Sequence, residues 1–340
     1  MSKTSYWTQV AATGLLVLLL FVTGCGSGTT SSPDGAKPKK FRIALVLPST
    51  VDDLSWAQPM YESLKKLQTA AGQDAVELSV SERLGRPIEA GTAIRQYASQ
   101  GYDIVFAHGA QFQSIVKEIA HEFPKVTFAY GAGYLTGPNI FAYDIEAQEG
   151  GYLLGLLAGK MSKSKIVGIV GPMEAGHGVK FNKGFQQGVI ASKAGVTTRI
   201  AYTGSFTDVV KAGDIAKTHM DAGADVLTGS SQQSVGAVKA VAGKPGIYWM
   251  STDADQTYLA PDTILASQVY KWDQLVTKIV DLRKQGVIGG QHLTLSFKQG
   301  LLELRYNPKL IGKIPPDVLA VVKQAEKDIT DGTLTIDVFK

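Results

Sequence analysis

The sequence predicts an α/β fold made of two doubly wound, Rossmann-like lobes, and three observations support this prediction. Short apolar, β-prone segments alternate with segments whose apolar residues recur at helical spacing. The β-prone segments are nearly continuous apolar runs, which is typical of parallel strands buried on both faces. Similar segments recur about 122 residues apart, as in Gly101-Tyr102-Asp103-Ile104 and Gly223-Ala224-Asp225-Val226. We therefore expect two α/β halves of similar build, joined by a hinge.

Nine strands are predicted from the apolar runs, with helices between them. They are Arg42–Leu47, Ala75–Val80, Asp103–Ala107, Val126–Tyr130, Lys165–Val170, Arg199–Tyr202, Asp225–Thr228, Ile247–Met250 and Ile264–Val269. Ligands of such parallel sheets bind beyond the carboxyl ends of the strands. Two facing lobes are therefore expected to line one cleft with these ends. The expected first lobe spans 41–145 plus about 265–297, and the second spans 146–264 plus about 298–340.

Residues 1–24 are predicted to form a lipoprotein signal peptide. Lys3 precedes an apolar run that ends in Val22-Thr23-Gly24-Cys25, which resembles the bacterial lipobox that is cut before a lipidated cysteine. The run is shorter than the roughly 20 residues of a spanning helix. Residues 25–40 are rich in Gly, Ser, Thr and Lys and predict a flexible tether. We expect an extracytoplasmic protein anchored to the cell membrane through Cys25; the alternative is a cleaved signal with an incidental cysteine.

The composition limits the function. The 340 residues contain one cysteine, so stability is expected to come from an apolar core rather than from disulfides. The net charge of +4 arises from scattered basic residues and does not indicate nucleic-acid binding. The five histidines do not have the spacing of metal ligands, and the chain contains neither a P-loop nor a Gly-x-Ser-x-Gly motif. We therefore expect no enzyme, no cofactor and no metal.

The loop after the first predicted strand carries a tryptophan among short polar side chains. Trp56 could offer a stacking face to a planar polar ligand, with hydrogen bonds from Asp53 and Ser55. Alternatively, Asp53 or Ser55 caps the following helix and Trp56 is a packing residue. The residues by themselves leave both interpretations open.

Five segments together resemble the basic membrane protein family of lipoproteins, typified by purine nucleoside receptors of ABC transporters. The first, Asp53-Leu54-Ser55-Trp56-Ala57-Gln58, is similar to the family's Asp-x-Ser-Phe-Asn-Gln. The others, in order, are 147–155 with its Glu-Gly-Gly-Tyr-Leu-Leu-Gly, 181–188, 202–208 with its Thr-Gly-Ser-Phe-Thr-Asp, and 251–256 with its Asp-Ala-Asp-Gln. The resemblance covers most of residues 41–275 and implies a type I periplasmic-binding-protein fold.

The resemblance also implies roles for individual residues. The family holds a purine base between two aromatic rings, and the matching positions are Trp56 and either Phe181 or Phe206. Asp253 would accept hydrogen bonds from ribose hydroxyls, for which a carboxylate has enough lone pairs. The implied partners are a small ligand in the cleft between the lobes and the permease of an ABC importer, and the protein is expected to be a monomer.

Two departures from the family pattern leave the ligand open. The asparagine that reads the base edge is replaced by Ala57, and Tyr270 stands where the family often has a lysine near the sugar. The expected ligand is therefore a purine nucleoside, a nucleobase or a similar small planar polar molecule. The alternatives are a sugar or other polar metabolite, a lipid-anchored nucleoside-processing enzyme, and a surface sensor.

Other residues are candidates because of their place in the chain. His108 follows a predicted strand, and Tyr143 and Asp144 lie where the chain is expected to cross between the lobes. His177 lies in a glycine-rich loop that could face a ligand. The predicted ligand-binding set is Asp53, Ser55, Trp56, His108, Asp144, Phe181, Phe206, Asp253 and Tyr270. Tyr143 and His177 are further candidates outside this set.

Overall fold

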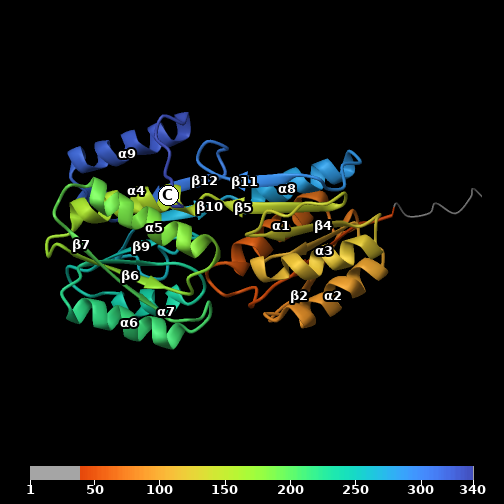
Figure 1. Cartoon of the computed structure of the whole chain (residues 1–340), viewed down its shortest axis with the longest axis horizontal. Coiled ribbons are helices and arrows are strands. Elements are labelled where there is room, and N and C mark those ends of the chain that lie inside the picture. The colour runs from red at the N-terminus through yellow and green to blue at the C-terminus, as the bar shows by residue number, and fades with distance from the viewer. Residues whose placement is uncertain (1–38, 340) are drawn as a thin grey trace, which may run out of the picture. The chain divides into compact units, whose positions relative to one another are not determined.

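Two six-stranded sheets form the framework of the molecule (Figure 1). The computed structural model describes residues 39–339. The predicted signal peptide, the lipidation of Cys25 and the tether up to residue 38 lie outside the described residues. Within the described part, residues from 39 onward belong to one compact unit.

The first sheet has the strand order β11-β5-β4-β3-β1-β2, and all of its neighbouring strands are parallel. It takes five strands from the first part of the chain and one from near the end. The bounds are β1 Phe41–Val46, β2 Val76–Ser81, β3 Ile104–Ala107, β4 Thr127–Gly131, β5 Ile140–Ile145 and β11 His292–Leu295.

The second sheet repeats this arrangement in the order β12-β10-β9-β8-β6-β7. Only its edge strand differs, because β12 runs antiparallel to β10. The bounds are β6 Ile166–Gly171, β7 Thr197–Tyr202, β8 Val226–Gly229, β9 Tyr248–Ser251, β10 Ile264–Tyr270 and β12 Leu302–Tyr306. The matching orders agree with the repeat seen in the sequence.

Helices cover both faces of the sheets. Alternate side chains of β1 point to opposite faces: Ile43 and Leu45 join the core that includes α1 and α8, whereas Ala44 and Val46 join the core beneath α2 and α3. The helices are α1 Ala57–Ala71, α2 Pro87–Ser99, α3 Gln113–Glu122, α4 Ala147–Met161, α5 Gly176–Ala191, α6 Val209–Asp221, α7 Ser234–Val241, α8 Trp272–Lys284 and α9 Pro316–Asp331, with short 3-10 turns η1 Ala110–Phe112 and η2 Ile311–Lys313.

The predicted α/β fold with two doubly wound lobes is confirmed. All nine predicted strands are present, with ends within two residues of the prediction. The strands β5, β11 and β12 were not predicted. The expected lobe boundary near residue 265 falls inside β10, which pairs with β9 and β12 in the second sheet. The strand β10 therefore belongs to the second lobe and not, as predicted, to the first. The chain crosses to the first lobe only after Tyr270.

The chain crosses between the lobes three times. The crossings join β5 to α4 at Glu146, β10 to α8 at Lys271, and β11 to β12 between Leu295 and Leu302. One apolar core runs through the crossings and includes residues of both lobes. The lobes are therefore held together by backbone and by packing at the same place.

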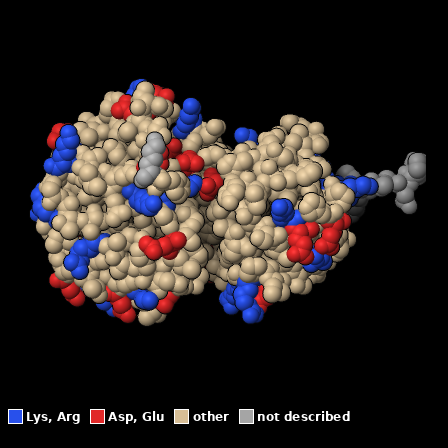
Figure 2. Space-filling model, viewed as in Figure 1, with Lys and Arg blue, Asp and Glu red and all other residues tan. Residues whose placement is uncertain are grey.

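Charged side chains are mixed on the face of the described residues that Figure 2 draws. Within residues 39–339, no helix is both long and apolar enough to cross a bilayer. On the face drawn in Figure 2, acidic and basic side chains are interspersed rather than separated. This distribution agrees with the scattered charges of the sequence.

Candidate functional site

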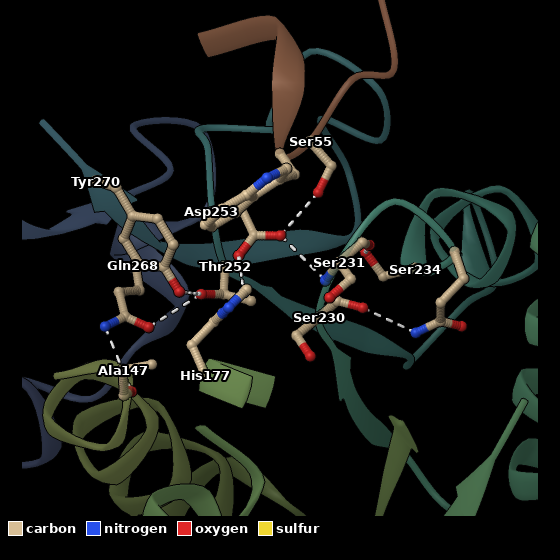
Figure 3. Close-up of polar contacts among 12 residues, drawn as sticks. Ser55, Ala147, His177, Ser230, Ser231, Ser234, Thr252, Asp253, Gln268 and Tyr270 are labelled. Carbon is tan, nitrogen blue, oxygen red and sulfur yellow. Dashed lines mark hydrogen bonds and ion pairs between the residues drawn. The ribbon is translucent and has the colours of Figure 1, made fainter. Parts of the chain in front are cut away.

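The loops at the carboxyl ends of the strands of both lobes meet at Asp253, which follows β9 (Figure 3). Ser55 Oγ, from the first lobe, donates to Asp253 Oδ2 over 2.8 Å, and the backbone N–H of Ser231, from the second, donates to the same oxygen over 3.0 Å. A second bond between the lobes runs from Gln256 Nε2 to the carbonyl of Leu54, at 2.8 Å. The carboxylate therefore links the two lobes.

Asp253 is a buried anion with one oxygen still available. The residue is 0% exposed, and its Oδ1 has no hydrogen-bond partner within the described residues. His177 Nε2 lies 3.7 Å from Oδ1. Burial by itself would raise the pKa of Asp253, but nearby His177 and the hydrogen bonds from Ser55 and Ser231 outweigh it and lower the pKa. The carboxylate is thus ionised at neutral pH.

Trp56, at the start of α1, lies between two imidazole rings. His108 stacks on one face, with ring centroids 4.2 Å apart and planes inclined by 10°. His177 stacks on the other face, at 4.7 Å and 15°. His108 belongs to the first lobe, as Trp56 does, whereas His177 lies in the first turn of α5 in the second lobe. The stack therefore crosses from one lobe to the other.

The Trp56–His108 pair is fixed by hydrogen bonds in the first lobe. Trp56 Nε1 donates to the carbonyl of His108, and His108 Nε2 lies 3.1 Å from the carbonyl of Trp56. Because a carbonyl only accepts, Nε2 carries the imidazole proton, and Nδ1 accepts from the Tyr143 hydroxyl at 2.8 Å. Burial lowers the pKa of His108 to about 3. The ring is thus neutral and held at both nitrogens.

Further aromatic rings surround this stack. The Trp272 ring meets Trp56 edge-on at 5.3 Å and His108 at 4.9 Å. The Tyr270 ring packs edge-on against Trp272, and its hydroxyl lies 3.1 Å from Thr252 Oγ1. Burial raises the pKa of Tyr270 well above its ordinary value, so the phenol is neutral. The walls around Asp253 are therefore largely aromatic, and the charged side chains of Glu62, Asp255 and Arg305 also line the adjoining pocket.

Several buried polar atoms near the carboxylate lack a partner among the described residues. They are His177 Nε2, Ser230 Oγ, Ser231 Oγ and Gln233 Oε1, besides Asp253 Oδ1. The backbone is also strained here: Leu54, Ser231 and Asp253 have positive φ angles of 63°, 65° and 73°. A pocket of about 210 Å³ opens beside these residues, lined by Leu54, Asp253, Tyr270 and others. The site thus has buried polar atoms that could bond a ligand, and it is built on loops with a strained backbone.

The structure brings together five of the residues predicted from the sequence, namely Ser55, Trp56, His108, Asp253 and Tyr270. It also brings in the further candidates Tyr143 and His177, whereas Asp53, Asp144, Phe181 and Phe206 make other contacts. The Asp53 carboxylate accepts from the backbone N–H groups of Ala57 and Gln58 at the start of α1, which is the capping alternative. Asp144, at the end of β5, pairs with Lys180 of α5 at 2.6 Å.

Among the described residues, the rings that contact the Trp56 ring are those of His108, His177 and Trp272, and neither predicted phenylalanine is among them. Phe181 is fully buried and packs against Phe185 in the core, and Phe206 lies 37% exposed in the loop after β7. The second-lobe ring on Trp56 is His177, which the sequence had marked only as a residue of a glycine-rich loop. Ser231 and Trp272 were not anticipated; the position of each directly after a strand was the only available signal.

Comparison with known families identifies the chain as a substrate-binding protein of ABC transport. The profile of one family, described as "ABC transporter substrate-binding protein PnrA-like" (Bmp), matches residues 40–328. The chain belongs to this family, as its resemblance to the basic membrane proteins indicated.

Individual relatives agree with this assignment. The chain is 26% identical to a purine-binding protein of Brucella abortus, over 87% of this chain and 83% of that protein. It is 25% identical to an ABC transporter nucleoside-binding protein of Lactococcus lactis, over 94% and 96% of the two chains. Among solved structures, an ABC transporter solute-binding protein from Aeropyrum pernix has a TM-score of 0.80 at 19% identity, covering 88% of this chain and 93% of that one.

Proposed function

We propose that this protein binds a purine nucleoside, a nucleobase or a similar small planar polar molecule in the cleft between its lobes. The observation that carries the proposal is the parallel ring pair of Trp56 and His177, contributed by opposite lobes and placed beside the open oxygen of Asp253. Aromatic faces recognise planar ligands, and a buried carboxylate accepts from hydroxyl or amino groups. The purine- and nucleoside-binding names of two relatives support the same ligand class.

The charge of the site favours an uncharged ligand over a phosphorylated one. Asp253 is ionised and buried, and the His108 imidazole and the Tyr270 phenol beside it are neutral. A phosphate placed beside this carboxylate would meet a like charge at low dielectric. We therefore expect nucleosides or bases to bind and the corresponding nucleotides to be rejected.

Calorimetric titration of the purified protein with adenosine, guanosine, inosine and adenine tests the proposal, with ribose, glucose and AMP as competing candidates. A ligand present at a hundredfold excess over its Kd stabilises the folded protein by about 2.7 kcal/mol, so the melting temperature gives an independent readout. We expect the nucleosides or the base to bind and to raise Tm. Binding of a sugar alone, or of none of the purines, would contradict the proposal.

The variant Asp253→Asn separates ligand recognition from folding. Asparagine keeps the size of the side chain but removes the charge, and its amide offers one acceptor oxygen in place of two. We expect nucleoside affinity to fall at least tenfold, as for loss of a charge-assisted hydrogen bond. The matched control is Asp262→Asn, an exposed carboxylate of the same lobe that pairs with Lys309 and does not line the pocket. Equal losses in both variants would argue against a specific role for Asp253.

We also propose that Cys25 is lipidated, that the protein is thereby held on the outer side of the cell membrane, and that it delivers its ligand to an ABC permease. The proposal rests on the lipobox-like Val22-Thr23-Gly24-Cys25 and on the family. Labelled palmitate should be incorporated into the wild-type protein and not into Cys25→Ser. Equal labelling of both would contradict the anchor.

A further inference from the structure

The two oxygens of the Asp253 carboxylate differ in how many donors already reach them. Oδ2 accepts from Ser55 Oγ at 2.8 Å and from the backbone N–H of Ser231 at 3.0 Å. Oδ1 has no hydrogen-bond partner among the described residues, and His177 Nε2, at 3.7 Å, lies beyond hydrogen-bonding distance. Each carboxylate oxygen has about two acceptor positions. Those of Oδ2 are therefore in use, and those of Oδ1 are open.

The donors on Oδ2 are held by the protein itself. The backbone N–H of Ser55 donates to Asp53 Oδ1 at 3.1 Å, and the next residue, Trp56, is fixed by its hydrogen bond to the first lobe. Ser55 and Ser231 are 0% and 2% exposed. In Figure 3 the dashed lines from both serines end on the same oxygen of Asp253. The two serines thus cover the Oδ2 side of the carboxylate.

The phenol of Tyr270 donates to another residue and leaves Oδ1 open. Thr252 Oγ1 donates its only proton to Gln268 Oε1 at 2.9 Å. The Tyr270 hydroxyl lies 3.1 Å from the same Thr252 oxygen, so it is the donor in that contact. Its proton is therefore directed to Thr252 and not to Asp253. A donor for Oδ1 has to come from the ligand.

We infer that Ser55 determines the specificity of the site: it occupies Asp253 Oδ2, so that a ligand donates to Oδ1 alone. The inference rests on the proposed function and deepens it. The two adjacent hydroxyls of a ribose can donate to both oxygens of a free carboxylate. Here the second hydroxyl would have to displace the Ser55 hydroxyl, which exchanges one hydrogen bond for another without gain. The site therefore accepts deoxynucleosides as well as ribonucleosides.

The test begins with calorimetric titration of the wild type. The ligands are whichever of adenosine, guanosine and inosine binds most tightly, together with its 2′-deoxy and 3′-deoxy analogues. At most one hydroxyl meets Oδ1, so at least one analogue should bind within about threefold of the parent nucleoside. If both hydroxyls met the carboxylate, each analogue would lose a charge-assisted hydrogen bond and bind about tenfold more weakly.

The variant Ser55→Ala should create the discrimination that the wild type lacks. It frees an acceptor position on Oδ2, so both ribose hydroxyls can donate to Asp253, and both analogues should bind about tenfold more weakly than the parent. Ser49→Ala is the matched control. It also removes a hydrogen bond between the lobes, from Gln232 Nε2 to Ser49 Oγ at 3.2 Å, but it leaves the donors on Asp253 in place. Its ratios of affinities should equal those of the wild type.

The ratio between ligands separates the two proposals, because a general loss of affinity in a variant cancels from it. The inference alone is overturned if both analogues bind the wild type more than about threefold more weakly than the parent, or if Ser55→Ala keeps the wild-type ratios. Binding of adenine without any nucleoside supports the inference, because adenine carries no diol. Failure of every purine to bind contradicts the proposed function and the inference with it.

Discussion

The carboxylate of Asp53 holds the start of α1 with both of its oxygens. One accepts from the Ser49 hydroxyl at 2.7 Å, and both accept from the backbone N–H of Ala57, at 2.9 and 3.1 Å. Little hydrogen-bonding capacity remains for a ligand. A residue that looked equally suited to capping and to binding in the sequence is therefore engaged in capping.

The variant Asp53→Ala should destabilise the protein without preventing ligand binding. Loss of a cap costs about 0.5–2 kcal/mol of the free energy of unfolding, because the first N–H groups of α1 lose their acceptor. Urea denaturation measures this loss, and calorimetric titration with the same purines as for the wild type measures affinity. If affinity falls a hundredfold while stability is unchanged, Asp53 contacts the ligand and the capping interpretation fails.

At the scale of residues, the sequence predicted which loops form the site but not which contacts the individual side chains make there. Trp56 and Asp253 were identified because each follows a predicted strand and matches a family segment. The choice between Phe181 and His177 was beyond the sequence, because these residues lie one helical turn apart on the same side of α5. The first turn of α5 reaches the cleft, and the next turn already packs in the core.

At the scale of elements, α4 and α5 approach each other along glycines. A Cβ atom added at Gly155 of α4 would lie 2.0 Å from the carbonyl oxygen of Phe185, and one at Gly188 of α5 would lie 2.0 Å from that of Tyr152. These obstacles are backbone atoms, which no side-chain rotation can move away. The close contact orients the helix that carries His177.

The variant Gly155→Ala should therefore lower the free energy of unfolding by about 2 kcal/mol or more, as overpacking of a core does. Gly312→Ala is the matched control, because a Cβ at that position meets nothing within 4 Å. Denaturation curves compare the two variants. Equal stability of Gly155→Ala and the control would show that the helices can separate at no cost.

There are physical reasons why β5, β11 and β12 were not predicted from the sequence. β11 and β12 are short edge strands with exposed or half-buried polar residues such as His292, Glu303 and Arg305, so the continuous apolar run that marks a central strand is absent. β5 is apolar and buried, but it ends at the first crossing, and the sequence was interpreted there as a connection between lobes. The local apolar pattern of the sequence thus predicted the central strands of the sheets more completely than the edge strands.

At the scale of the whole molecule, a titratable group lies where the lobes are joined. Glu149, in the first turn of α4, accepts from the backbone N–H of Phe297 in the third crossing, at 2.8 Å. Burial, assisted by the nearby charge of Glu146, raises the pKa of Glu149 to about 7, above about 4.3 for an exposed glutamate. The folded protein therefore binds this proton more tightly than the unfolded chain does.

The stabilisation linked to this proton is complete below about pH 4.3 and is lost as the pH rises through about 7. The variant Glu149→Gln keeps an acceptor for Phe297 but does not ionise. It should melt at a higher temperature than the wild type at pH 8, and the difference should shrink at pH 5. Asp221→Asn, on the exposed end of α6, is the control. A constant difference between Glu149→Gln and wild type at both pH values would exclude the linkage.

One edge strand of each sheet, β11 or β12, comes late in the chain. The first sheet has five strands once residue 145 has been synthesised, but β11 is added only at residue 292, after the second lobe has nearly ended. A ribosome-bound chain therefore carries an incomplete first lobe, with the outer edge of β5 open, through most of its synthesis. Neither lobe can be obtained as one uninterrupted fragment, and a chain stopped before residue 292 should expose an unpaired strand edge and tend to aggregate.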